Sequence, residues 1–557
     1  MSVTRKVLIV VALLAVLAVT WVWWGRPVRV DMAAYVPADA VVYLEANSLP
    51  EVAEALTSTA AWRELSGPSA GGRGGAGRWG RFAALTGVGS GQAVVLARAQ
   101  VAVVVFGFKA AEGDGAAIVA PRVALVAETH TGDWRARPAV EKLVGDFARR
   151  QFGEPRVVRT ELDGVPAVAW AEAEGSRRRI VSVVEEGVAV VGNDEAVVRA
   201  CLDVRRGARQ SLAGNAQLEE MRTRLDAGSA LTFGFAPEGS AAKGAEVLAP
   251  FLAGAAAEEP RIQSMLATLL PKLSDQLVKG VGWSARVAGG RVEDRYLLVL
   301  PEGMAGLLRG PLATVEAPTY AAAALLPPDT YDATFYHLRN PEFAWRGVLA
   351  ATSSHVDVSN AMFVSAILQA SLQSFGVEEP REFLRDVGSE VVTARLGEGD
   401  EGKVMIVEVL DRNSLRAWAL RQTGARPEEF AGAELFAARD PERPAAAFAG
   451  DHLILGPAAD VRRCLLARQQ GRTLREEDAL KSLTNGARAP AFAQSLTDDS
   501  AAAAAVVSSL SGRGPARAQA DHYTVTETRL NEVGIERKTI SAFGQFGELA
   551  TRLNRGR

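Results

Sequence analysis

Cysteine and histidine are scarce in this chain, and their scarcity limits the chemistry that it can carry. The 557 residues include two cysteines, Cys201 and Cys464, and five histidines. No histidine has a second histidine or a cysteine at the spacing of metal ligands, which argues against a zinc site of the usual kind. The sequence therefore predicts no metal-binding residues.

A strong charge of one sign is also lacking. Lysine and arginine together number 62 and aspartate and glutamate 65, so the net charge is −3 at pH 7. Nucleic-acid-binding domains usually carry a basic surface, and this balance does not provide one. Apolar residues make up 48% and charged residues 23% of the chain, as in ordinary globular proteins. We therefore expect globular structure and no nucleic-acid partner.

Motifs for nucleotide binding and nucleophilic catalysis are missing as well. Residues 72–77 (GRGGAG) fit G-x-G-x-x-G, but they follow a predicted helix, whereas a dinucleotide site follows a strand. We interpret them as a glycine-rich loop. Ser90 and Ser389 do not lie in a G-x-S-x-G elbow, so we expect turns or caps before strands there. The sequence thus predicts no catalytic residues, no cofactor-binding residues, no cofactor and no enzymatic activity.

One long hydrophobic run does occur. Residues 7–24 (VLIVVALLAVLAVTWVWW) carry no charge, and a helix rising about 1.5 Å per residue nearly spans a hydrocarbon core of about 30 Å over this length. Arg5 and Lys6 precede the run and place the N-terminus in the cytoplasm by the positive-inside rule. A cleaved signal peptide is the alternative, but the small residues of a cleavage site are missing. With an alanine- and arginine-rich, bacterial composition, this predicts a single-pass protein of the bacterial inner (cytoplasmic) membrane, with the bulk of the chain extracytoplasmic.

Short motifs recur in the same order in the two halves of the chain. The clearest match joins residues 190–202, around Cys201, to residues 454–465, around Cys464. Three further matches accompany it: 35–47 with 326–340, 87–90 with 386–389, and closing hairpins at 281–300 and 522–542. Such order predicts an internal repeat. We expect a cytoplasmic tip and transmembrane anchor at 1–30, a first unit at 31–303, a linker at 304–319 and a second unit at 320–557.

Each predicted unit mixes β-strands with amphipathic helices. Residues 181–191 have the pattern of a hairpin with its turn at Glu185 to Gly187, and Asn193 is a candidate N-cap for the following helix. Most strands are joined by short turns, which favours antiparallel pairing. The predicted fold class is α+β, with two tandem copies of a mixed, largely antiparallel sheet-and-helix unit behind one N-terminal transmembrane helix.

The two cysteines occupy matching positions on the apolar face of the same predicted helix. Equivalent core positions of separate units lie far apart, beyond the roughly 7 Å between Cα atoms that a disulfide spans. We therefore expect Cys201 and Cys464 to be buried free thiols. A disulfide and a reactive or metal-ligand role are the alternatives.

The order of elements resembles a broad group of uncharacterised bacterial membrane-anchored proteins that contain a domain of unknown function. The motifs that carry this resemblance are Pro-Ala-Asp39, Gly-Asn193, and Ser541-Ala-Phe-Gly544-Gln-Phe-Gly547. The resemblance implies an exported, duplicated α+β fold, and it implies no known activity or catalytic residue.

Three hypotheses about function follow from these observations. The first is a membrane-anchored extracytoplasmic scaffold or interaction protein, held in the membrane by residues 7–24 and bound to an envelope protein. The second is a carrier or binder of an apolar ligand such as a lipid, with residues 101–106 and 265–270 as candidate cavity walls or ordinary core. The third is a hydrolase with a site between the two repeats, built from residues that differ between them.

Overall fold

The computed structural model describes most of the chain. The described residues are 29–66, 95–113, 116–174, 178–246, 260–398, 402–438, 443–476, 491–511 and 523–545, with a few single residues between these ranges. Three features of the sequence lie outside them: the predicted anchor at 7–24, the glycine-rich loop at 72–77, and Ser90.

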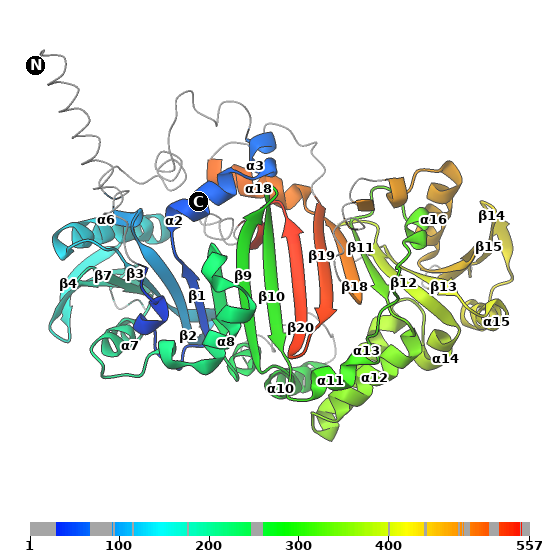
Figure 1. Ribbon diagram of the computed structural model, residues 1–557, viewed down its shortest axis with the longest axis horizontal. Coiled ribbons are helices and arrows are strands. Elements are labelled where there is room, and N and C mark those ends of the chain that lie inside the picture. The colour runs from blue at the N-terminus through cyan, green and yellow to red at the C-terminus, as the bar shows by residue number, and fades with distance from the viewer. Residues whose placement is uncertain are drawn as a thin grey trace, which may run out of the picture.

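In the described residues, 20 strands form one sheet (Figure 1). The strands of the first half of the chain are β1 (Val42–Ala46), β2 (Gln100–Gly113), β3 (Ala116–Glu128), β4 (Arg156–Leu162), β5 (Val165–Ala171), β6 (Arg179–Glu185), β7 (Val188–Gly192), β8 (Thr232–Ala236), β9 (Gly280–Ala288) and β10 (Arg291–Val299). The strands of the second half are β11 (Asp332–His337), β12 (Val387–Arg395), β13 (Lys403–Val409), β14 (Glu428–Phe430), β15 (Ala433–Phe436), β16 (Ala445–Ala449), β17 (His452–Gly456), β18 (Ala493–Asp498), β19 (Tyr523–Leu530) and β20 (Gly534–Ser541).

The strands pair in the same order when the sheet is followed inward from either edge, and all pairs are antiparallel. From one edge the order is β4-β5-β6-β7-β3-β2-β1-β8-β9-β10. From the other it is β14-β15-β16-β17-β13-β12-β11-β18-β19-β20. Strands β10 and β20 then pair with each other, from Val292 opposite Ser541 to Val299 opposite Gly534. We call β9, β10, β20 and β19 the central strands.

The pairing of β10 with β20 corrects the predicted fold class. Instead of two tandem units behind a transmembrane helix, the described residues contain one large antiparallel sheet with helices. The physical reason lies at the last strand of each half. Without a partner, β10 and β20 would each expose a row of N–H and C=O groups, and pairing with each other satisfies both rows.

The predicted membrane topology is corrected as well. No helix among the described residues is long and apolar enough to cross a membrane, which conflicts with a single-pass protein of the bacterial inner membrane. The two longest described helices, α6 (Asp133–Phe152) and α10 (Pro260–Leu277), show the reason, because each carries charged side chains and an internal proline. The apolar run that motivated the prediction, residues 7–24, lies outside the described residues.

Helices cover both faces of the sheet (Figure 1). On the face that we call the cavity face, α6 packs on β5 to β7. On the same face α2 (Leu49–Thr57), α3 (Ala60–Leu65) and α18 (Ser500–Ser511) cover one end of the central strands. The other end is covered by α10, α11 (Met304–Arg309) and α12 (Pro341–Ser353), with α13 (Val358–Gln373), α14 (Pro380–Arg385) and α15 (Arg412–Thr423) beyond. Helix α11 thus forms within the range 304–319 that the sequence predicts as a linker.

The opposite face, which we call the charged face, carries α7 (Glu195–Arg205), α8 (Ala216–Arg224) and α16 (Ala458–Gln470). Helix α7 packs on β3, β6 and β7, and α16 packs on β13, β16 and β17. Cys201 and Cys464 lie on these helices as buried free thiols, which confirms that prediction. Burial raises the pKa of both thiols to about 12, so neither is a ready nucleophile.

Candidate functional site

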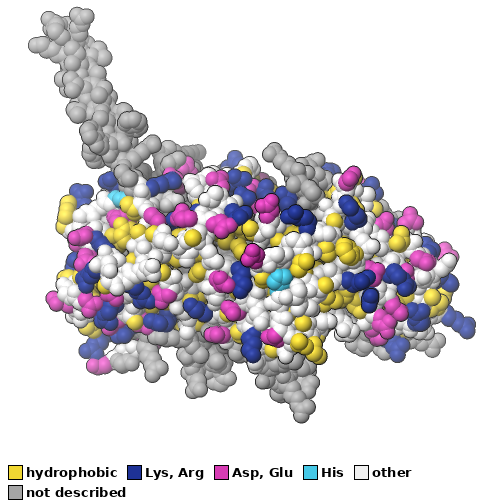
Figure 2. Space-filling view, turned by 60° about the horizontal axis from the view of Figure 1, so that its bottom comes forward, with side chains coloured by type: hydrophobic (Ala, Val, Ile, Leu, Met, Phe, Trp, Pro, Cys, Tyr) yellow, Lys and Arg dark blue, Asp and Glu magenta, His cyan; other side chains and the backbone are white. Residues whose placement is uncertain are grey.

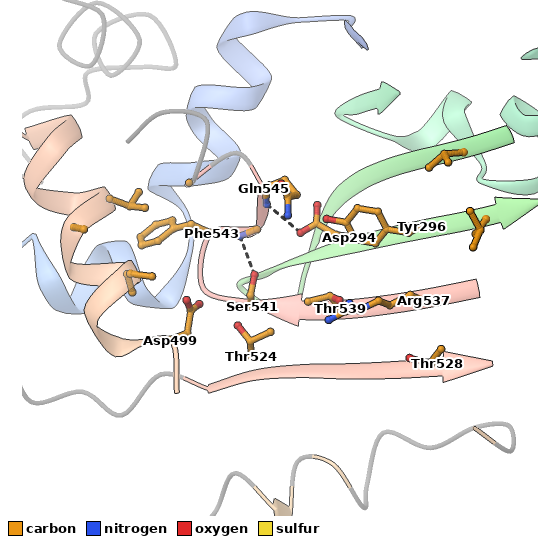
Figure 3. Close-up of a pocket in the computed structure, with 18 of the residues that line it drawn as sticks. Asp294, Tyr296, Asp499, Thr524, Thr528, Arg537, Thr539, Ser541, Phe543 and Gln545 are labelled. Carbon is orange, nitrogen blue, oxygen red and sulfur yellow. Dashed lines mark hydrogen bonds between the residues drawn. The ribbon is translucent and has the colours of Figure 1, made fainter. Parts of the chain in front are cut away.

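A cavity of about 890 Å³ lies on the cavity face of the central strands, where the two halves of the sheet meet (Figure 3). Its floor is formed by β10, β20 and β19, and α18 and the segment after β20 form its walls. The polar, charged and large apolar side chains that line it include Asp294, Tyr296, Leu298, Asp499, Thr524, Thr528, Ile535, Arg537, Thr539, Ser541, Phe543 and Gln545. We call it the central cavity.

Strand alternation places these side chains on one face. Successive residues of a strand point to opposite faces, so Asp294, Tyr296 and Leu298 of β10 lie on the cavity face together. Their partners across the β10–β20 pair are Thr539, Arg537 and Ile535, in that order. The floor therefore changes along the strands from carboxyl and hydroxyl groups, through a tyrosine and an arginine, to two aliphatic side chains.

Asp294 organises the polar end of the cavity. It is 1% exposed, and its carboxylate accepts hydrogen bonds from Trp283 Nε1 at 2.9 Å and from the Gln545 backbone N–H at 3.2 Å. Gly544 precedes Gln545 with a φ of +59°, and a Cβ there would overlap the Asp294 carboxylate. Asp294 thus fixes the segment that follows β20, and Figure 3 shows that segment closing the end of the cavity.

Hydroxyl side chains continue from the cavity floor across the neighbouring strands. Thr526 and Thr539 lie opposite each other on β19 and β20, with their oxygens 3.1 Å apart. Farther along the same face, the hydroxyl oxygens of Ser495 and Thr334 are 2.9 Å apart. This row offers donors and acceptors on the sheet beside the cavity.

Arg537 is the exposed cation of the central cavity. No ion pair and no side-chain hydrogen bond joins its guanidinium to any other part of the chain that the structure describes. Its neighbours on β20 differ, because Glu536 pairs with Arg295 at 2.8 Å and Lys538 pairs with Glu293 at 3.1 Å on the charged face. Arg537 therefore presents its charge to the cavity, beside Tyr296 on β10.

A second cavity, of about 430 Å³, begins where the first ends, and we call it the apolar cavity. Leu298 and Ile535 line both cavities. Beyond them the walls are almost wholly aliphatic, formed by Leu273, Leu277, Val278, Leu300, Met304, Leu308, Leu312 and Val348, with Phe492, Ser274 and Thr352. These walls come from α10, α11, α12 and the ends of the central strands. The two cavities therefore adjoin at Leu298 and Ile535, and we call the pair of them the groove, with a polar α18 end and an apolar α10 end.

The candidate walls named from the sequence fall in different places. Residues 101–106 lie in β2, where Ala102 and Val104 are fully buried in the core between strands and helices. Residues 265–270 belong to α10, but the apolar cavity is lined by the following turns of that helix, at Leu273 and Leu277. The closing hairpins at 281–300 and 522–542 and the motif from Ser541 to Gly547 contain most residues that line the central cavity, but the sequence assigned none of them a role in binding.

Ser389 has a structural role in its surroundings. Its hydroxyl and its backbone N–H both donate to the Glu408 carboxylate, at 3.1 and 2.8 Å. No histidine or cysteine lines either cavity among the described residues, and Ser541 accepts a hydrogen bond from the Gly544 backbone N–H at 2.8 Å. The expectation that the protein is not an enzyme stays a prediction.

The sequence also did not identify a buried polar cluster on the charged face. Glu390 is 3% exposed, and its carboxylate lies 3.2 Å from His452 Nε2. His452 is the first residue of β17, and its side chain is only 13% exposed. His337 lies opposite Glu390 on β11 and is 2% exposed. Glu390 and His337 are thus enclosed in the protein.

No family model, no curated protein and no solved structure matches the chain. The resemblance to membrane-anchored proteins of unknown function therefore stays a prediction. The functional argument rests on the groove itself.

Proposed function

We propose that the protein binds an amphipathic small molecule in the groove formed by the central and apolar cavities. The observation that carries the proposal is the pair Leu298 and Ile535, which lines both cavities and divides hydroxyl and charged groups from aliphatic walls. A ligand that lies across this pair places an apolar chain among leucines and a polar group over the sheet. The volumes of both cavities fall in the range of about 300–1,000 Å³ that is usual for ligand sites.

The energetics require both parts of such a ligand. Each methylene group that leaves water contributes about 0.8 kcal/mol, so ten of them contribute about 8 kcal/mol. Association costs about 4–15 kcal/mol in lost freedom of motion. A plain hydrocarbon is therefore a marginal ligand, and polar contacts in the central cavity supply the remaining affinity.

The test is to fill the apolar cavity. Leu277 of α10 lines that cavity and is half-buried, so Leu277→Trp should block it with a modest effect on folding. We expect dodecanol and dodecanoate, titrated calorimetrically into the purified full chain, to bind the wild type and to bind Leu277→Trp at least about tenfold more weakly, which corresponds to about 1.4 kcal/mol.

The matched control is Leu466→Trp. Leu466 lies on α16 over the charged face and is 39% exposed, so the same exchange there should leave binding unchanged. Thermal unfolding of both variants shows whether each is folded. Absence of binding to the wild type, or equal binding by the folded Leu277→Trp variant, would refute the proposal.

A second candidate, the interaction function expected from the sequence, is favoured by one surface. Helix α13 is rich in apolar residues, yet Val358, Met362 and Ile367 are 77%, 70% and 44% exposed. Figure 2 turns the lower side of Figure 1 forward and shows hydrophobic patches among interspersed acidic and basic side chains. Apolar patches of this kind often mark contact surfaces. Substitution of Met362 by Lys should abolish a crosslink to a partner if this surface is used, and should leave dodecanoate binding intact.

A further inference from the structure

We propose that the ligand is an anionic amphiphile, with a carboxylate or phosphate head bound by Arg537 and an alkyl chain in the apolar cavity. This inference rests on the proposed ligand-binding function and adds the chemical class of the ligand. Three observations lead to it. Arg537 has no ion-pair partner among the described residues, and it lies between the polar and apolar ends of the groove. The nearby carboxylates, Asp294 and Asp499, already accept hydrogen bonds from the protein.

The charge of Arg537 has no counterion in the part of the chain that the structure describes. Other cations of the central strands have partners: Arg286 pairs with Glu293 at 2.6 Å and Arg529 with Glu527 at 2.7 Å, while Arg291 donates to the backbone carbonyls of Tyr523 and Ile540. Arg537 is the exposed exception, and it lines the central cavity. A guanidinium presents a planar fork of donors that matches carboxylate and phosphate oxygens in a bidentate pair.

The position of Arg537 along β20 sets where the head group lies. Ile535 is two residues away on the same face, a separation of about 6.6 Å along a strand. A head group on Arg537 therefore leaves only a few methylenes above the floor before the chain passes Leu298 and Ile535 into the apolar cavity. Tyr296 lies opposite Arg537 and borders the same position.

The two aspartates of the central cavity define the orientation of the ligand in the groove. Asp294 is buried and already accepts from Trp283 and Gln545, and Asp499 accepts from the Ala542 backbone N–H at 3.4 Å. Both belong to the α18 end, on the side of Arg537 away from Ile535. An anionic head is thus repelled from the α18 end and attracted to Arg537, which holds its chain toward α10.

The experiment compares head groups of equal chain length on the full chain. Dodecanoate, dodecyl phosphate, dodecanol and dodecylamine are titrated calorimetrically below the concentrations at which they form micelles, against wild type, Arg537→Gln and Lys538→Gln. Lys538 is the matched control, because it is a cation on the adjacent residue that faces the opposite side and pairs with Glu293. We expect the anions to bind the wild type about ten- to a hundredfold more tightly than dodecanol, as for a charge-assisted hydrogen bond.

In Arg537→Gln the affinity for the anions should fall to that for dodecanol, while dodecanol binding stays unchanged. Lys538→Gln should alter neither. The ranking of dodecanoate against dodecyl phosphate assigns the head group to the carboxylate or the phosphate class. If dodecanol binds as tightly as the anions, or if Arg537→Gln binds dodecanoate like the wild type, the inference is overturned while the proposed function stands. If no amphiphile binds the wild type, both fail.

Discussion

The two faces of the central strands use the same segments of chain in different ways. On the charged face, Glu293 lies between Arg286 and Lys538, and Glu536 pairs with Arg295. On the cavity face, hydroxyl groups, the guanidinium of Arg537 and the side chains of Leu298 and Ile535 surround open volume. Because side chains alternate along a strand, residues 536, 537 and 538 serve different faces within three positions. The comparison indicates that one face joins the two halves of the sheet and the other leaves room for a ligand.

The largest effect should come from separating β10 from β20. A Cβ on Gly534 would overlap the Leu298 carbonyl oxygen, which belongs to the backbone of the neighbouring strand. We expect Gly534→Ala to lower the free energy of unfolding by about 2–4 kcal/mol, since backbone cannot move aside easily, and to abolish dodecanoate binding. Urea unfolding followed by circular dichroism measures the change.

Gly306→Ala is the control for that change. Gly306 lies in α11 with nothing near the position of a new Cβ, so alanine should be neutral or stabilise the protein by up to about 1 kcal/mol. A Gly534→Ala variant as stable as wild type would mean that the two strands are not tightly paired.

The next effect concerns the polar end of the groove. In Asp294→Asn, an amide N–H₂ replaces one carboxylate oxygen and meets either Trp283 Nε1 or the Gln545 N–H, both of which are donors. We expect a loss of about 1–3 kcal/mol for the buried unsatisfied pair. The fluorescence of Trp283 should change with it. Unchanged stability in urea would show that Asp294 does not hold the segment after β20.

A direct comparison of the faces pairs Glu293→Gln with Arg537→Gln. Glu293 is 5% exposed and neutralises two cations, so its loss should cost about 1–2 kcal/mol. Arg537 has no partner among the described residues, and its substitution should change the unfolding free energy by less than about 0.5 kcal/mol. Equal losses in the two variants would contradict the division of roles.

The smallest effect is a pH dependence on the charged face. Burial lowers the pKa of His337 from its usual 6.5, although Glu390 and a hydrogen bond with Gln494 oppose the shift. A lowered pKa means that the unfolded chain binds the proton more readily, so this contribution to stability is present above about pH 6.5 and is lost as the pH falls. Burial also lowers the pKa of His130, so its contribution to stability changes with pH in the same direction.

We therefore expect the free energy of unfolding to fall less in His337→Phe than in the wild type when the pH is lowered from 7.5 to 5.5. The difference between the two losses should be a few tenths to about 1 kcal/mol. Urea unfolding at the two pH values gives the difference. Glu45 acts in the opposite direction, because burial raises the pKa of its carboxyl, and comparison of variant with wild type removes its contribution. Parallel pH profiles would exclude His337 as a titrating group.

Local features of the fold could be predicted from the sequence where a few adjacent residues decide the conformation. The turn at Glu185 to Gly187 joins β6 and β7, and Glu186 and Gly187 have φ values of +47° and +83° as a tight hairpin requires. The N-cap of α7 was placed one residue early. Asp194 is the cap, while the Asn193 side chain donates to the Pro121 carbonyl and accepts from the Val123 N–H. Two capping residues in a row cannot be told apart without their neighbours in space.

The pairing of β10 with β20 and the groove beside it could not be predicted in the same way. The pairing of Val292 with Ser541 depends on which strand edge is left free in each half, and this is a property of the assembled sheet. The groove combines residues of α10, β10, β20 and α18, and each one alone resembles an ordinary strand or helix position. Arg537 lies between Glu536 and Lys538 in an alternating strand, and only the three-dimensional structure shows that, unlike them, it has no ion-pair partner among the described residues.

The distance along the chain between β10 and β20 has a consequence for biosynthesis. β10 ends at Val299 and β20 begins at Gly534, so at about 5–20 residues per second the ribosome adds the intervening chain in roughly 10–50 s. During that interval a nascent β10 has a free edge that any other strand can join, including β10 of a second copy. A chaperone that shields this edge would raise the yield of correctly joined protein, and the groove would form only after β20 has joined.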